Sequence, residues 1–383
     1  MTETTPTTST SVPDSRRASH LQILLLALIA LVAASCGGDD PPTTEGTPTS
    51  ATPVDEELDE ILPPGTHVGI SWFAPPAPGT EDQTLALWEE ANAEATIGRV
   101  MIDWIEVEPV EGDYAFTELE EQLRNITDRG ALPMVTIVAV DVSGTPFPEW
   151  LGGFEPERAA EAYAGMLEAA APILEEHDVW LLAVANEPPL EDDLDIGEFT
   201  EFVAGVEERA DTLLPDIPVT FVFAGGDAVK QDPATRELAA AVDVFSLNHY
   251  CLHPDLLVID AEDTASYLEE SMVLAGDKPV VFQEFGCPAS EELGSSEEYQ
   301  AAWFEAAFDA IRADDQVVAA FVFEFGNWSD ELVELDYGEA FAAEPELGWL
   351  FDRLGQWVGT SGLIRPDATT RPAWDVYLAN LGG

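Results

Sequence analysis

Eight apolar runs alternate with amphipathic segments along most of this chain, and the alternation limits the fold more than any other feature. The runs are short and nearly continuous in apolar residues, and they cover 67–72, 97–104, 131–140, 179–185, 218–224, 242–247, 279–282 and 317–325. The segments between and after them carry apolar residues at helical spacing, at 82–95, 116–129, 156–176, 196–214, 233–241, 265–275, 296–313 and 347–358. Apolar strands that alternate with helices are typical of a parallel sheet covered by helices.

This pattern predicts an α/β fold, a single (β/α)₈ barrel over residues 66–383. The alternative is a doubly wound open sheet, which usually has fewer strands. No Gly-x-Gly-x-x-Gly turn follows an early run, which also disfavours that alternative. In a (β/α)₈ barrel the functional residues lie at the C-terminal ends of the strands, so the ends of the apolar runs are the places to examine.

A targeting segment precedes the predicted barrel. Arg16 and Arg17 stand before an apolar run, Leu21 to Ala34, that is too short to span a bilayer comfortably. The run ends Val32-Ala-Ala-Ser-Cys36, which resembles a bacterial lipoprotein signal whose cysteine is lipidated and becomes the mature N-terminus. We therefore expect a signal at 1–35, a lipid on Cys36, and a protein in the cell envelope outside the cytoplasm, in the periplasm or on the cell surface. An ordinary cleaved secretion signal is the alternative.

Residues 36–65 are rich in Pro, Thr, Gly, Asp and Glu and hold few large apolar side chains. Such a composition cannot bury a core, so it predicts a flexible acidic tether.

The charge of the chain excludes several partners. It has 75 acidic against 14 basic residues, a net charge of −61. Nucleic acid and anionic lipid headgroups need a basic surface, so we expect no nucleic-acid partner, and membrane contact only through the N-terminal lipid. A strongly solvated surface of the halophilic kind is the favoured interpretation. A role in binding a cation or a basic substrate is the alternative.

A glutamate closely follows two of the apolar runs. Glu187 follows the fourth run in Asn186-Glu187-Pro188, and Glu284 follows the seventh in Gln283-Glu284-Phe285-Gly286. A retaining glycosidase needs two carboxylates so placed, one as acid/base and one as nucleophile, and it needs no cofactor. The alternative is that both are structural, although a glutamate in an apolar setting is rarely buried without a partner.

These motifs resemble those of the clan-A glycoside hydrolases, retaining (β/α)₈ enzymes, and look closest to family 5 and its neighbours. The resemblance implies that Glu187 is the acid/base and Glu284 the nucleophile. It also implies a set of residues around them: Arg99 to hold the nucleophile ionised, Asn186 to bind the sugar 2-hydroxyl, Tyr250 to contact the nucleophile, and Trp328 to form a platform under the sugar.

The sequence departs from the family pattern after the sixth run. Where family 5 members commonly have His-x-Tyr, this chain has Asn248-His249-Tyr250. Either Asn248 replaces that histidine, or His249 takes over its substrate contact. Asp141 follows the third run, at a position where a histidine is often found. Glu324 also precedes Phe-Gly, but in the eighth run, and it is not expected to be the nucleophile; support of the site or contact with substrate is an alternative to a plain structural role. Trp104 either lines the cleft or lies in the core.

Cys251 and Cys287 lie just after the sixth run and just after Glu284. The ends of neighbouring barrel strands can bring two cysteines within bonding range, and an oxidising location favours a disulfide. Two free thiols remain an alternative. A metal site with His249 and His253 is another, although His-x-Cys-x-His is not a standard zinc spacing.

Together these features predict a monomeric retaining β-glycosidase that acts on a β-linked oligo- or polysaccharide, with endo-action favoured. A non-catalytic glycan-binding lipoprotein on the same barrel is the main rival. A structural surface protein whose charge is its main property is a third hypothesis.

Overall fold

The computed structural model describes residues 62–72, 74–141, 147–188, 194–230, 232–343 and 347–381. The predicted signal, Cys36 and the predicted tether up to residue 61 lie outside the described residues. Leu62 is buried and packs with Ile97 and Phe321, so the folded part reaches at least to Leu62, ahead of the predicted boundary at 66.

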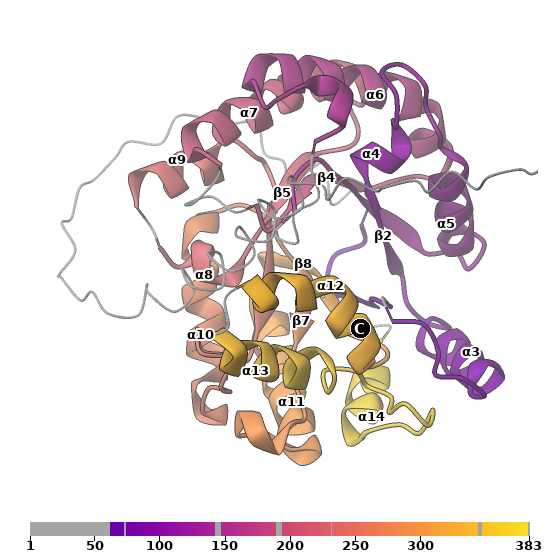
Figure 1. Ribbon diagram of the computed structural model, residues 1–383, viewed down its shortest axis with the longest axis vertical. Coiled ribbons are helices and arrows are strands. Elements are labelled where there is room, and N and C mark those ends of the chain that lie inside the picture. The colour runs from indigo at the N-terminus through magenta and orange to yellow at the C-terminus, as the bar shows by residue number, and fades with distance from the viewer. Residues whose placement is uncertain are drawn as a thin grey trace, which may run out of the picture.

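Eight parallel strands form a nearly closed barrel, in the order β1-β8-β7-β6-β5-β4-β3-β2 (Figure 1). Each coincides with one apolar run: β1 His67–Ile70, β2 Ile97–Asp103, β3 Leu132–Val138, β4 Leu181–Asn186, β5 Val219–Phe223, β6 Phe245–Tyr250, β7 Val280–Gly286 and β8 Val317–Val322. β1 lies close beside β2, since a Cβ added to Gly69 would be 3.2 Å from the Ile97 carbonyl oxygen. The (β/α)₈ prediction is confirmed.

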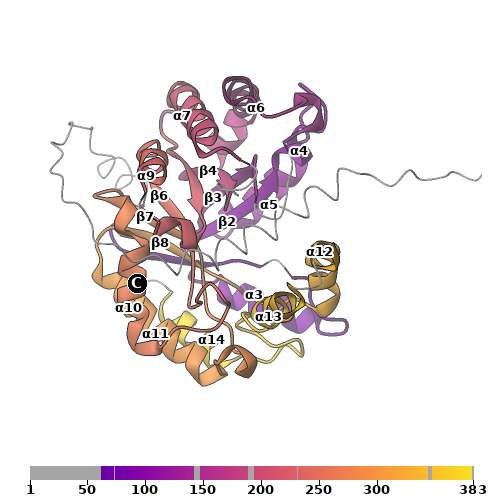
Figure 2. The same cartoon turned by 60° about the vertical axis from the view of Figure 1, so that its left-hand side comes forward.

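Helices surround the strands on all sides of the barrel in Figure 2. Those expected from the sequence are α3 Glu81–Ala91, α5 Thr117–Thr127, α6 Pro156–Glu176, α7 Ile196–Leu213, α9 Pro233–Ala240, α10 Thr264–Ser271, α11 Glu297–Ala313 and α13 Gly348–Val358. Four others were not expected: α4 Trp104–Val107, α8 Gly225–Ala228, α12 Asp330–Ala343 and α14 Pro372–Ala379. α4 and α8 are too short to show a period, and α12 and α14 lack a clear apolar stripe. Short 3₁₀ turns lie at Glu149–Leu151, Ala261–Asp263, Val273–Ala275 and Glu291–Leu293.

The inside of the barrel changes character from one end to the other. Toward the N-terminal ends of the strands it is filled by apolar side chains such as Ile97, Met134 and Val281. Toward the C-terminal ends the inward positions become polar, with Thr136 and Gln283 buried and hydrogen-bonded to each other. Side chains alternate between the two faces of a strand, so the apolar partners of the helices lie on the outer face.

The last part of the chain forms a small second cluster beside the barrel. Leu252, Val333, Phe341, Leu350 and Leu354 pack together there, and the partly buried ring of Tyr250 joins them. α12 and α13, which carry most of these residues, therefore cover the C-terminal end of β6. In Figure 1 they stand in front of β7.

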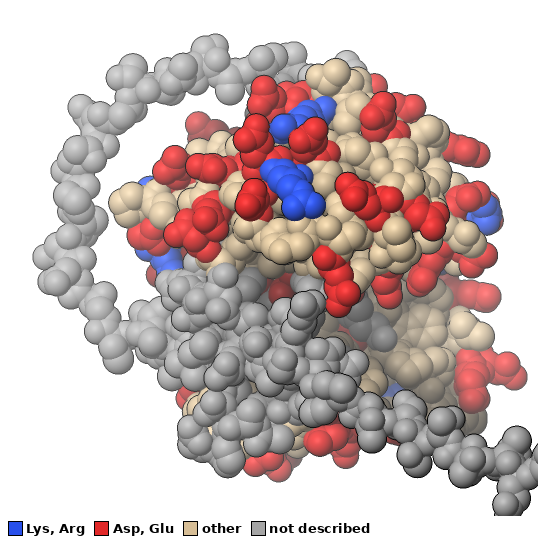
Figure 3. Space-filling model, turned by 45° about the horizontal axis from the view of Figure 1, so that its top comes forward, with Lys and Arg blue, Asp and Glu red and all other residues tan. Residues whose placement is uncertain are grey.

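The exterior is strongly acidic. On the part of the surface that Figure 3 shows in colour, red acidic side chains are scattered among tan ones, and the blue basic side chains are few. None of the helices in the described part of the chain combines the length and the apolar character needed to cross a membrane.

Candidate active site

Glu284 lies near the C-terminal end of β7, where two donors hold its carboxylate. A guanidinium nitrogen of Arg99, on β2, lies 3.1 Å from Oε1 in an ion pair that is almost fully buried. The Tyr250 hydroxyl, at the end of β6, donates to Oε2. Arg99 is itself fixed by a 3.0 Å hydrogen bond to the Gln283 carbonyl oxygen. The predicted contacts of Arg99 and Tyr250 with Glu284 are thus present.

Tyr250 must keep its proton in order to donate it to Glu284. Burial raises the pKa of the Tyr250 hydroxyl well above its usual value, and the negative charge of Glu284 raises it further. The phenol therefore stays neutral at any ordinary pH. The rings of Trp357 and Phe323 pack against Tyr250 with centroids 4.7 and 5.5 Å away, and these two aromatic neighbours were not predicted.

Glu187 comes directly after β4 and has an unusual backbone. Its φ of 46° lies in the left-handed region, which non-glycine residues rarely adopt. Its N–H donates to the Val222 carbonyl oxygen at 2.9 Å, so pairing with β5 continues through this residue. Such a conformation costs on the order of 1–3 kcal/mol and concentrates at functional sites. Glu187 is half-buried here, and the preceding Asn186 is buried.

The surroundings of Glu187 favour its protonated form. Burial raises the pKa of the Glu187 carboxyl well above its usual value, the charge of Glu284 adds to this, and that of Asp141 adds further. A hydrogen bond from Asn248 acts in the opposite direction and is weaker. Glu187 and Glu284 are therefore electrostatic neighbours, although the strands that carry them are not adjacent in the barrel.

Asn186 is held by a buried polar network. Its amide nitrogen donates to Asp141 Oδ2 at 2.9 Å. Its Oδ1 accepts from Gln283 at 3.2 Å and from Asn248 at 3.3 Å. Gln283 is fixed in turn by Thr136. The network joins β3, β4, β6 and β7 beneath the two glutamates.

The prediction that His249 binds substrate is wrong. Alternation along β6 places Asn248 and Tyr250 on the inner face and His249 on the outer face. There His249 packs against Tyr267 and Phe282, with ring centroids 5.1 and 5.9 Å away. Burial lowers the pKa of His249 to about 3, so it is a neutral core residue. Of the two interpretations left open, replacement by Asn248 is the one the structure supports.

The eighth strand places two predicted residues together. The Trp328 indole donates to Glu324 Oε2 at 3.1 Å and stacks on Tyr337, with centroids 6.1 Å apart. Glu324 is fully buried. The sugar-platform role of Trp328 stays a prediction. Trp104 is a fully buried core residue, and its indole N–H donates a hydrogen bond to the Glu108 carboxylate.

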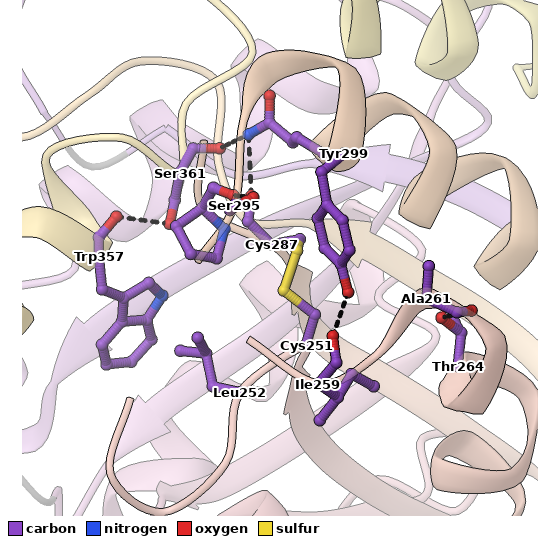
Figure 4. The surroundings of a disulfide bond; sticks show 12 residues. Cys251, Leu252, Ile259, Ala261, Thr264, Cys287, Ser295, Tyr299, Trp357 and Ser361 are labelled. Atoms are coloured by element: carbon purple, nitrogen blue, oxygen red, sulfur yellow. Dashed lines mark hydrogen bonds between the residues drawn. A yellow bond between two sulfur atoms is a disulfide. The ribbon is translucent and has the colours of Figure 1, made fainter. Parts of the chain in front are cut away.

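A disulfide joins Cys251 and Cys287, as predicted, and neither free thiols nor a metal site remains at this pair. Both cysteines are fully buried, and Cys251 N–H donates to the Gly286 carbonyl oxygen at 3.0 Å. Figure 4 shows this disulfide. Beside it, the Tyr299 hydroxyl donates a hydrogen bond to the carbonyl oxygen of Ile259, in the loop that follows Cys251. The described residues contain no group of three or more His, Cys, Asp or Glu side chains suited to hold a metal ion.

Comparisons with solved structures identify the same (β/α)₈ fold. No family model and no curated protein matches this chain. Several solved glycoside hydrolases do match its structure. One is a GH5_18 protein variant from Bifidobacterium longum in complex with Manb1-4GlcNAc, at TM-score 0.62 and 11% identity over 82% of this chain and 77% of that one.

Two further structures extend the likeness. A GH5_18 from Streptomyces cattleya in complex with GlcNAc matches at TM-score 0.59 and 18% identity, over 83% of this chain and 80% of that one. Xylanase 10B from Thermotoga maritima matches at TM-score 0.57 and 17% identity, over 85% and 97%. At these identities the likeness establishes the fold, the (β/α)₈ barrel that these glycoside hydrolases have.

Proposed function

We propose that this protein is a retaining glycoside hydrolase that cleaves β-linked glycans. The observation that carries the proposal is the pair of glutamates at one end of the barrel. Glu284 is held by the Arg99 guanidinium and the Tyr250 hydroxyl, while burial and the charge of Glu284 raise the pKa of Glu187. One carboxylate suited to attack and one suited to donate a proton are the two parts that retaining hydrolysis needs.

In the first step a Glu284 oxygen attacks the anomeric carbon, and Glu187 gives its proton to the glycosidic oxygen. The bond from that carbon to the leaving oxygen breaks, the leaving sugar departs as an alcohol, and a glycosyl ester forms on Glu284. Arg99 and Tyr250 hold Glu284 during the attack, because they fix both of its oxygens.

In the second step Glu187 acts as a base. Ester formation removes the charge of Glu284, and with it a main cause of the raised pKa of Glu187. Glu187 is then able to take a proton from water, whose oxygen attacks the anomeric carbon and releases Glu284. The site thereby returns to its starting protonation state.

The substrate class rests on the neighbours and on the sequence. The matched structures include a complex with Manb1-4GlcNAc and a xylanase, which support a β-linked glycan as substrate. We keep endo-action on a polysaccharide as part of the proposal. Product lengths from a defined oligosaccharide series test it, since an exo-enzyme would release only terminal units.

The cellular setting is proposed from the sequence alone. We propose that a lipid on Cys36 anchors the protein to the cell envelope and that its acidic surface suits a saline environment. Replacement of Cys36 by alanine should move the protein from the membrane fraction to the soluble fraction. Recovery of the variant in the membrane fraction would contradict the anchor.

The deciding experiment is a hydrolysis screen on β-glucans, β-mannans, β-xylans and β-galactans with wild type and Glu284→Gln. It is run at low and at high salt, because salt screens the self-repulsion of so acidic a chain. We expect wild type to release sugar with the β-anomer formed first, as followed by proton NMR, and the variant to be inactive. Binding of a glycan without turnover would favour the non-catalytic rival instead.

The distance between the carboxyl groups of Glu187 and Glu284 provides a second test. Retaining enzymes place their two carboxyl groups about 5–5.5 Å apart, and inverting enzymes about 6.5–9.5 Å apart. A crystal structure in which Glu187 and Glu284 are separated by about 9 Å would exclude the retaining mechanism.

A further inference from the structure

We propose that Asp141 is a positioning residue of this site, which fixes the side-chain amide of Asn186 and places a carboxylate charge next to Glu187. The inference rests on the proposed function for its kinetic consequences. Asp141 was not among the residues predicted for the site, and the structure places it among the residues around the two glutamates.

The backbone brings Asp141 to this place. Beyond the regular part of β3, Ala139 N–H donates to the Val184 carbonyl oxygen at 2.9 Å, and Asn186 N–H donates to that of Val140 at 3.0 Å. Asp141 then pairs in parallel with Asn186 as an isolated bridge. The two side chains are consequently next to each other, and Asp141 is only 7% exposed.

The hydrogen bonds around Asn186 define a single orientation of its amide. A carboxylate only accepts, so Asp141 requires the amide nitrogen of Asn186 on its side. The side-chain nitrogens of Gln283 and Asn248 only donate, so they require the amide oxygen of Asn186 on their side. If the Asn186 amide were flipped, its oxygen would face the Asp141 carboxylate and its nitrogen would face the two donors. Asp141 therefore removes an alternative conformation of the residue that precedes Glu187.

The charge of Asp141 acts on Glu187 at the same time. The charged and titratable groups that face Glu187 come from four elements: Glu284 on β7, Asp141 after β3, Asp227 on α8 and Tyr250 on β6. Glu284 is paired with Arg99, and Asp227 with Lys230 at 2.6 Å. After Glu284, Asp141 is the strongest of the charged neighbours that raise the pKa of Glu187.

Two substitutions separate these effects. Asp141→Asn keeps an oxygen that can accept from Asn186 but removes the charge, so the pKa of Glu187 should fall. The basic limb of the pH profile of kcat/KM should then move to lower pH. Asp141→Ala removes the acceptor too, and we expect a further loss of about tenfold to a hundredfold in kcat/KM across the whole pH range. Glu237→Gln, which removes an exposed charge on α9, is the matched control and should leave the profile in place.

A second readout needs no substrate. The Glu187 carboxyl carbon is followed by NMR in ¹³C-labelled protein, with Glu187→Gln to assign the signal. We expect its titration midpoint to be lower in Asp141→Asn than in wild type and in Glu237→Gln. Equal midpoints in a folded Asp141→Asn protein would overturn the inference.

The two proposals fail in different ways. If wild type cleaves no glycan, the proposed function fails, while the NMR titration still tests the effect of Asp141 on Glu187. If wild type cleaves glycan and Glu284→Gln does not, but Asp141→Asn keeps the wild-type pH profile, only the role of Asp141 fails.

Discussion

The two glutamates of the site lie in opposite electrostatic surroundings. Glu284 meets a guanidinium and a phenol, from Arg99 and Tyr250. Glu187 meets carboxylates, those of Glu284 and Asp141. Burial and charged neighbours thus give two chemically identical side chains different properties, which under the proposed function suit one to attack as an anion and the other to hold and release a proton.

The two sides of the site are also braced differently. Beside Glu284 the chain is held covalently, because the disulfide joins the residues that follow β6 and β7. The chain has three cysteines in all, and the third is Cys36. The Glu187 side therefore relies on hydrogen bonds, those of Asn186 and of the left-handed Glu187 backbone.

Removing the proton donor should have the largest effect. Glu187→Gln is expected to lower kcat/KM, which reports the first step, by about 10²–10⁴-fold on glycans. The loss of kcat/KM should be much smaller on a nitrophenyl glycoside, whose leaving group departs without protonation, while kcat falls on both substrates because the second step needs Glu187 as base. Kinetics on both substrate types check this. Equal losses of kcat/KM on the two would contradict the assignment of Glu187 as the acid.

Breaking the buried ion pair should come next. Arg99→Met leaves the Glu284 carboxylate buried without its cation, and loss of one partner of a buried pair costs about 3–5 kcal/mol of stability. Tyr250→Phe removes one hydroxyl and should cost about 1 kcal/mol. Urea unfolding of both variants measures the difference. If Tyr250→Phe proved the more destabilising, the ion pair would not be the main support of Glu284.

Removing the disulfide should affect stability more than chemistry. The bridge closes a loop with a sequence separation of 36, for which chain entropy gives about 4 kcal/mol. We expect Cys251→Ala with Cys287→Ala to lose most of that in denaturant unfolding. Hydrogen bonds such as that from Cys251 N–H to Gly286 remain, so kcat at 25 °C should stay within about threefold of wild type. A large loss of kcat in the folded variant would show that the covalent brace itself positions Glu284.

The smallest effect is a pH-dependent gain of stability in Glu187→Gln. The pKa of Glu187 is raised in the folded state, so wild type loses stability as pH rises from the ordinary glutamate range through the folded-state value. Glutamine does not ionise and escapes this loss. Thermal midpoints should therefore agree near pH 4 and favour the variant at pH 8. A wild type as stable as the variant at pH 8 would contradict the raised pKa.

Much of the architecture could be predicted from the sequence because local patterns carry it. The bounds of α6, Pro156–Glu176, follow from its apolar spacing and its initial proline, and the eight apolar runs locate the eight strands. α8 and α12 could not be predicted from the sequence, because the four residues of α8 are too few to show a helical period and α12 has no clear apolar stripe. Helices of this kind form through tertiary packing rather than through a local signal.

The candidate site likewise has features that the sequence predicts and features that only the tertiary structure shows. The sequence by itself determined Glu187 and Glu284 as candidates, since strand ends are readable from hydrophobicity, and the resemblance to clan-A glycoside hydrolases added Arg99, Asn186 and Tyr250 around them. Only the tertiary structure decided that Asn248 faces inward and His249 outward, and that Asp141 meets Asn186. The physical reason is that a one-residue change of register reverses the face of every side chain, and contacts between distant strands depend on how the whole barrel closes.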